Sequence, residues 1–319
     1  MNDVKIGGRG AGRAADHAPW LALLLSLPSG LAGVALAWVL IVPEPLPAEA
    51  VVRVVADGVG ATALGLAALP RMAPRLRTPW RLLAVLAGVW AIAEFAVLVF
   101  EAADVVGVPV ADLGAAQFGT YLVDVSGGQV GIAILIGVGA VAGGSALAFR
   151  RPESASGDLV LVFAAVALAL RPITGHMSQQ AFGSVLAAVH ALAAAAWLGL
   201  LIALALVVRT RGEWAVVLPR YSGVALPLVV TVAVTGLLNG LIRVGGIVPF
   251  VTTGYGRILL AKTVVLLGLL ALGWWWRRSW VPRAAGHRMG ADASLRRAVA
   301  EVIVMALAFG LAATLAVTA

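Results

Sequence analysis

The sequence of 319 residues contains no cysteine and few charged residues. Without cysteine the chain can form neither disulfide bonds nor thiolate metal sites, so any bound metal must be held by imidazole, thioether, carboxylate or backbone oxygen. Charged residues make up 12% of the chain, against roughly 25% in soluble domains, and 61% of the residues are hydrophobic. This composition, with a mean hydropathy of +1.01, predicts an integral membrane protein.

Apolar runs of about 20 residues recur along the chain, and this length crosses roughly 30 Å of hydrocarbon as an α-helix. We therefore predict an all-α fold, a polytopic transmembrane helix bundle of about nine spans. The fourth span carries a break or extra length. The predicted spans cover residues 20–42, 51–69, 82–101, 118–149, 159–171, 183–208, 221–241, 256–276 and 298–317.

The basic residues separate into two groups along this pattern. Eighteen of the 23 Lys and Arg residues fall in the N-terminal tail and in alternate loops, and the other five are Arg53, Arg171, Arg243, Arg257 and Lys262. The positive-inside rule then places the N-terminus in the cytoplasm and the C-terminus outside. The net charge of +8 therefore reflects orientation in the membrane and does not indicate nucleic-acid binding. We divide the chain into a cytoplasmic tail (1–19), a first half of four spans (20–150) and a second half of five spans (151–319).

Ionisable side chains inside membrane spans are costly and usually functional. The predicted orientation places most of the polar groups roughly 5–12 Å below the outer surface, which suggests a polar chamber facing outward. They are Asp57, Glu94, Asp124, His190, Thr235, Asn239 and Lys262. Glu94 has no basic neighbour in its own helix, so we expect it to have a functional or a buried pairing role. In the inner half, Glu301 is expected to pair with Arg297 at i,i+4.

Simpler roles for three of these groups stay open. The side chain of Lys262 could extend to the outer interface. Asp57 could pair with Arg53 on its own helix face. Asp124 could cap a helix.

Two of the four histidines lie close together in the sequence, at His176 and His190. Proline and glycine break the helix at 172–175, so His176 and Met177 are expected on an outer loop. His190 lies within a span, on the same helix face as Trp197 seven residues later. Imidazole and thioether groups suit copper, which makes His176, Met177 and His190 candidate metal ligands. We take Trp197, Glu94 and Lys262 with His190 as candidate cofactor-binding residues; a histidine bonded only to a neighbouring helix is the simpler alternative.

Several blocks of the second half together resemble the CopD family of copper resistance membrane proteins. They are "GH" at 175–176 with "HALAAAAWLGLLIAL" from His190, "RYSGVALPLVVTVAVTGLLN" from Arg220, "YGRILLAKTVVLLGLLALG" from Tyr255 and "LRRAVAEVIV" from Leu295. The resemblance implies a multi-pass protein of copper homeostasis in the bacterial inner membrane. It also implies copper uptake from the periplasmic side and a separate copper-binding partner of the CopC type. The positions it implies are His176, His190, Trp197, Gly199 and Lys262; Leu200 replaces a second glycine that the family often has.

Two other functions stay open. A b-type haem or redox membrane protein would use His190 as an axial ligand, and an assembly factor for copper oxidases would need no route through the membrane. The inner half offers few copper ligands, with Met305 in the last span and Met289 and His287 in the inner loop. This scarcity counts against simple permeation. We expect a transporter or metal-binding protein in contact with membrane lipid rather than an enzyme.

Overall fold

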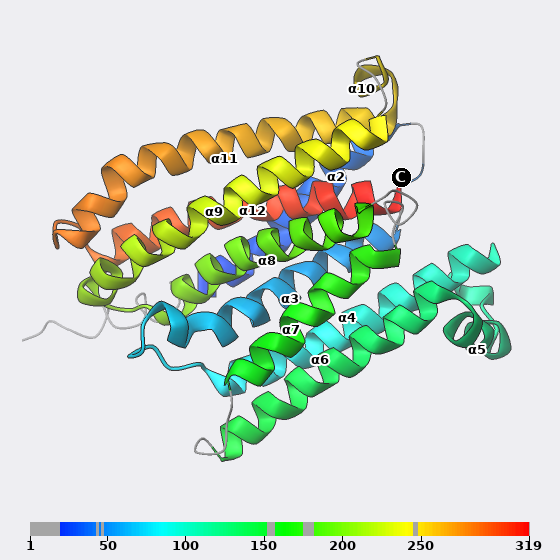
Figure 1. Cartoon of the computed structure of the whole chain (residues 1–319), viewed down its shortest axis with the longest axis horizontal. Coiled ribbons are helices and arrows are strands. Elements are labelled where there is room, and N and C mark those ends of the chain that lie inside the picture. The colour runs from blue at the N-terminus through cyan, green and yellow to red at the C-terminus, as the bar shows by residue number, and fades with distance from the viewer. Residues whose placement is uncertain are drawn as a thin grey trace, which may run out of the picture.

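The computed structural model describes residues 20–42, 45, 48–151, 157–174, 182–244 and 248–318. The candidate ligands His176 and Met177 lie outside these residues. Within the described residues the chain is helical and contains no strand, so the predicted all-α class is confirmed (Figure 1). The longer helices are α2 (Leu21–Ile41), α3 (Ala48–Met72), α4 (Trp80–Val106), α6 (Ser126–Arg150), α8 (Gly183–Val207), α9 (Arg211–Val244), α11 (Gly254–Ala285) and α12 (Ala291–Val317).

Within the described residues, these eight helices are long and apolar enough to cross a membrane. The predicted break in the fourth span is present, because the short helix α5 (Ala115–Asp124) is separated from α6 by the extended residue Val125. The remaining predicted span, 159–171, is the shorter helix α7 (Gly157–Leu170) of 14 residues. A 3₁₀ turn, η4 (Arg171–Thr174), continues it, because the proline at 172 disfavours α-helix in the residue before it.

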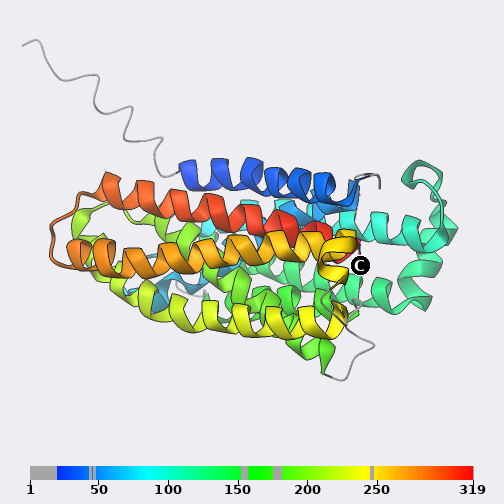
Figure 2. The same ribbon diagram turned by 90° about the horizontal axis from the view of Figure 1, so that it is seen from above.

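The directions of the helices agree with the predicted topology. Helices α2 and α12 lie side by side and run the same way, so Leu21 and Val317 are at opposite ends of the bundle (Figures 1 and 2). The basic connections α3–α4, α8–α9 and α11–α12 gather at one end, on the left of Figure 1. We call the opposite end, where α3, α8 and α11 begin and α12 ends, the outer end, after the orientation predicted from the basic residues.

The centre of the bundle is the contact between α3 and α8. A Cβ atom added to Gly199 would fall on the carbonyl group of Ala61, and one added to Gly65 would fall on the carbonyl group of Gly199. The two backbones therefore touch, as small residues allow in membrane helices. Around this contact α8 buries Leu198, Leu201 and other apolar side chains completely. The packing fixes the position of α8, and with it His190 on its outer half and Trp197 just past its middle.

Helices α9 and α11 lie next to each other along one side of the bundle (Figure 1). Many of their large apolar side chains are exposed, among them Leu237, Leu241, Val264 and Leu267. Such surfaces suit contact with acyl chains. The short helix α10 (Pro249–Thr252) precedes α11 at the outer end, and the 3₁₀ turn η2 (Val110–Asp112) follows α4.

Candidate functional site

A cavity of about 430 Å³ lies at the outer end, between α3, η4, α8, α9, α11 and α12. Most of its lining is apolar. Its polar and charged lining residues are Arg53, Asp57, Arg171, His190, Trp197, Asn239, Arg243, Tyr255, Lys262 and Thr263. Met305, from the middle of α12, also lines it and contributes a thioether. Of the seven polar groups predicted to form an outward-facing chamber, four line this cavity and three do not. The four are Asp57, His190, Asn239 and Lys262; the three are Glu94, Asp124 and Thr235.

The hydrogen bonds of His190 define its tautomer. Its Nδ1 atom lies 2.9 Å from the Oγ1 atom of Thr235, and this hydroxyl lies 2.6 Å from the carbonyl oxygen of Thr231. A hydroxyl has one proton to donate, and here it goes to the carbonyl. His190 must then donate from Nδ1, which leaves the lone pair of Nε2 free. The imidazole thus presents an unprotonated Nε2 atom to the cavity.

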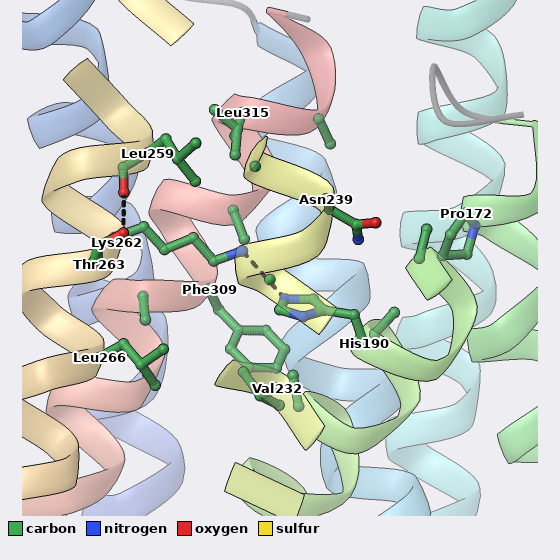
Figure 3. Close-up of a pocket in the computed structure, with 18 of the residues that line it drawn as sticks. Pro172, His190, Val232, Asn239, Leu259, Lys262, Thr263, Leu266, Phe309 and Leu315 are labelled. Carbon is green, nitrogen blue, oxygen red and sulfur yellow. Dashed lines mark hydrogen bonds between the residues drawn. The ribbon is translucent and has the colours of Figure 1, made fainter. Parts of the chain in front are cut away.

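Lys262 approaches this free nitrogen from the facing helix. Its Nζ atom lies 3.4 Å from Nε2 of His190 (Figure 3). The lysine side chain crosses the cavity from α11 toward the imidazole, so it does not extend to the outer interface. Among the described residues it forms no ion pair with a carboxylate. Its ammonium group and the histidine therefore form one polar contact inside the cavity.

The sequence around Thr235 fits the histidine closely. A Cβ atom added to Gly236 would lie 3.1 Å from Cε1 of His190, which is tighter than most packing contacts. Thr235 fixes the orientation of the imidazole ring through its hydrogen bond, and Gly236, which has no side chain, leaves space for the ring. Asn239, one turn further along α9, lines the same cavity, and its Oδ1 atom is buried without a partner in the described part of the chain. In the "TGLLN" block, Thr235 and Gly236 therefore contact His190, and Asn239 lines the same cavity.

An ion-pair network lies beside the cavity, linking α3, α4 and η4. Glu101 accepts hydrogen bonds from Arg53 at 2.8 Å and from Arg171 at 2.9 Å. Glu94 pairs with Arg171 and accepts a hydrogen bond from the indole of Trp90 at 2.9 Å. The buried pairing expected for Glu94, which is only 4% exposed, is therefore present. Its carboxylate does not line the cavity.

Asp57 and Asp124 are placed differently from expectation. Arg53 pairs with Glu49 and Glu101, so the alternative Asp57–Arg53 pair is wrong. Asp57 lines the cavity without an ion pair to any described residue. Asp124 ends α5 and is exposed, away from the cavity, because the chain turns at the next residue.

Trp197 and Glu301 lie further from the outer end of the bundle than His190 does. The buried Trp197 lines the cavity, and Glu301 lies beside its indole. The expected Glu301–Arg297 pair is wrong, because α12 directs Glu301 toward α8 while the guanidinium of Arg297 lies 2.7 Å from the sulfur of Met289. Gly199, also implied by the family resemblance, has a packing role in the α3–α8 contact.

The structure thus brings His190, Trp197 and Lys262 together and leaves Glu94 in the adjacent network. The part of the chain that is described contains no group of three or more His, Asp or Glu residues placed to hold a metal ion. The set nearest to a copper site is one imidazole with one thioether, His190 and Met305, on a shared cavity. Sequence reasoning did not identify Arg171 and Arg243 as cavity residues.

Comparison with known families covers most of the chain. The model of the copper resistance protein D family matches residues 215–315, and the model of the copper resistance protein D-like N-terminal domain matches residues 22–181. Neither a curated protein nor a solved structure matches the chain. The two matched regions contain the cavity helices α3, α9, α11 and α12 and the ion-pair network. This multi-pass membrane protein therefore belongs to the copper resistance protein D family.

Proposed function

We propose that this chain takes up copper from the periplasmic side of the bacterial inner membrane and binds it in the outer cavity. The observation that carries the proposal is the unprotonated Nε2 atom of His190, which Lys262 contacts in the absence of metal. Thr235 fixes the ring so that this nitrogen faces a cavity that Met305 also lines. Imidazole nitrogen and thioether sulfur are favourable copper ligands, and thioether in particular favours Cu(I). Membership of a copper resistance family supports copper as the metal.

Copper would first meet His176 and Met177 on its way to this nitrogen. Pro172 precedes that segment and Ala187 follows it in the sequence, and both line the cavity. Ser184 donates a hydrogen bond to the carbonyl oxygen of Ile173 at 3.0 Å, which joins the two sides. Arg171, held by two glutamates, anchors the preceding turn. A separate periplasmic protein of the CopC type would deliver the metal to this face.

The copper content of two histidine variants tests the proposal. His190→Ala removes the nitrogen that faces the cavity, and His287→Ala is a matched control, because His287 is exposed in the α11–α12 connection at the opposite end. Purified protein loaded with copper and then desalted is assayed for bound metal. We expect His190→Ala to lose the cavity-bound copper and His287→Ala to retain it. Equal copper in wild type and His190→Ala would overturn the proposal.

Haem b is a second candidate, favoured by the same two side chains. His190 and Met305 both line a cavity whose walls are mainly apolar, and imidazole with thioether is a known axial ligand pair for haem iron. A visible absorption spectrum of the purified protein separates the two candidates. A Soret band that disappears in His190→Ala would assign the cavity to haem, and bound copper without such a band would assign it to copper.

A further inference from the structure

The outer cavity has more positive than negative charge. Four basic side chains line it, Arg53, Arg171, Arg243 and Lys262, against one carboxylate, that of Asp57. The first two arginines are balanced by glutamates of the adjacent ion-pair network. Arg243 and Lys262 have no carboxylate partner among the described residues. Two cations therefore remain without a counter-charge at this cavity.

Of these two cations, Lys262 is the one whose lack of a counter-charge is energetically more unfavourable. An ammonium group removed from water is strongly unfavourable unless a counter-charge or a full set of acceptors surrounds it. It has three protons to donate, and in the part of the chain that is described its one polar contact is Nε2 of His190. At least two of its donor positions are open to a ligand.

Further polar groups face the same space from α9 and α11. Asn239 and Arg243 are one turn apart on α9, and Tyr255 and Lys262 are two turns apart on α11, so each pair shares a helix face. The guanidinium of Arg243 lies over the ring of Tyr255, 5.4 Å from its centroid, which holds it at the mouth of the cavity. Asn239 also lines the cavity, and its side chain points away from Lys262 toward Pro172 (Figure 3).

We propose that the outer cavity binds an oxyanion, a carboxylate or phosphate group, through the ammonium of Lys262 and the guanidinium of Arg243. Guanidinium and ammonium groups form their strongest hydrogen bonds with such anions. Asn239 lines the same cavity, and its NH₂ group is a further possible donor to the anion. This inference goes beyond copper binding and does not depend on it. When copper is present, the anion would offset the positive charge that otherwise repels the metal.

The rest of the lining indicates what can be attached to the anion. Leu259, Leu266 and Phe309 make the walls apolar. Leu237 and Leu241 line the cavity and are also 63% and 56% exposed, so the cavity reaches the surface that faces lipid. The oxyanion can therefore be a small solute from the periplasmic side or the headgroup of an anionic lipid.

Thermal unfolding of the metal-free, full-length protein in an uncharged detergent tests the inference. The added probes are inorganic phosphate, citrate, phosphatidylglycerol and, as the lipid without net charge, phosphatidylcholine, with sodium chloride holding the ionic strength constant. An oxyanion that binds the folded protein raises the Tm in a saturable way. A response to phosphate or citrate identifies a small solute, and a response to phosphatidylglycerol alone identifies a lipid headgroup.

Variants locate the response in the cavity. Lys262→Met and Arg243→Gln should each raise the half-saturating concentration by about tenfold or more, the loss expected for one charged hydrogen bond. Lys262→Arg should keep the response, and so should Arg150→Gln, which changes an exposed arginine at the opposite end. If Lys262→Met does not fold, Arg243→Gln carries the test, because Arg243 is exposed at the cavity mouth.

Two results would overturn the proposal. In the first, no oxyanion raises the Tm of the wild type beyond the effect of chloride and phosphatidylcholine. In the second, the Tm rises with the same half-saturating concentration in wild type, Lys262→Met and Arg243→Gln.

Discussion

The Nζ atom of Lys262 and the Nε2 atom of His190 lie 3.4 Å apart, although the residues are 72 positions apart in the sequence. The nitrogen that would bind copper is thus the one that the ammonium group contacts. A metal ion and the lysine cannot occupy this position together, so Lys262 must move when copper binds. Copper affinity should therefore depend on the charge of residue 262.

Replacing Lys262 by leucine, which has neither a charge nor a metal-binding atom, should increase the affinity for copper by about tenfold or more. Two like charges about 4 Å apart repel by about 4 kcal/mol at an effective dielectric constant of 20, and movement of the lysine relieves only part of this. Copper titration against a competing chelator, in a buffer without carboxylate or phosphate, measures the change. Lys262→Arg is the control that keeps the charge. Weaker binding by Lys262→Leu would show that Lys262 assists the metal.

Thr235→Val should weaken copper binding by about tenfold to a hundredfold, as loss of a hydrogen bond to a ligating histidine commonly does. Valine has the shape of threonine but cannot accept the Nδ1 proton, so the ring loses its orientation. Copper titration against the same competing chelator measures this change in affinity. Thr231→Val is a matched control, because Thr231 contacts Thr235 through its backbone carbonyl and not through its side chain. Equal affinities in the two variants would remove Thr235 from the site.

Gly236→Ala should displace the His190 ring, because the added Cβ atom would lie 3.1 Å from Cε1. Overpacking of this kind typically costs about 1–3 kcal/mol of stability. We expect reduced copper content and a lower Tm. Gly223→Ala, in the same helix, is the control, because its added Cβ atom meets no described atom within 4 Å. Copper content unchanged in Gly236→Ala would show that the ring position is not important for binding.

Gly199→Ala should prevent the close approach of α3 and α8 and reduce the yield of folded protein. In most helix interiors, replacing glycine by alanine stabilises by roughly 0.5–1 kcal/mol, so the expected effect has the opposite sign. Gly139→Ala in α6 is the control, because it meets no described atom within 4 Å. The Tm of the purified protein measures the loss of stability, and the monodisperse fraction in gel filtration measures the yield of folded protein. A Gly199→Ala variant as stable as Gly139→Ala would contradict the backbone contact.

Glu94→Gln should lower the free energy of unfolding by about 3 kcal/mol, because breaking a buried ion pair leaves Arg171 incompletely compensated. Unfolding titrations in denaturing detergent measure the change. Asp112→Asn is the control, since Asp112 is exposed in η2 and forms no ion pair with a described residue. Equal effects of the two substitutions would show that the Glu94–Arg171 pair contributes little to stability.

The long helices could be predicted because lipid demands about 20 apolar residues per crossing. The bounds of α7, Gly157–Leu170, lie close to the predicted span 159–171, but its continuation as the 3₁₀ turn η4 could not be predicted. The partner of Glu94 could not be predicted either, since Arg171 is 77 positions away and only tertiary packing joins them.

The sequence carries one further signal for the cavity. Five basic residues fall outside the group that sets the orientation, and four of them, Arg53, Arg171, Arg243 and Lys262, line the cavity. Arginine and lysine at the outer ends of spans oppose the positive-inside rule and so need a functional or pairing explanation. That these four side chains meet at one cavity follows only from the tertiary structure.

X-ray absorption at the copper edge of the loaded protein tests most directly whether His190 binds the metal. The spectrum reports the nitrogen and sulfur atoms around copper, and His190→Ala, Met305→Leu and His287→Ala are compared with wild type. We expect the nitrogen shell to weaken in His190→Ala and the sulfur shell to weaken in Met305→Leu, while His287→Ala leaves the spectrum unchanged. Identical spectra in wild type and His190→Ala would contradict copper ligation in the outer cavity.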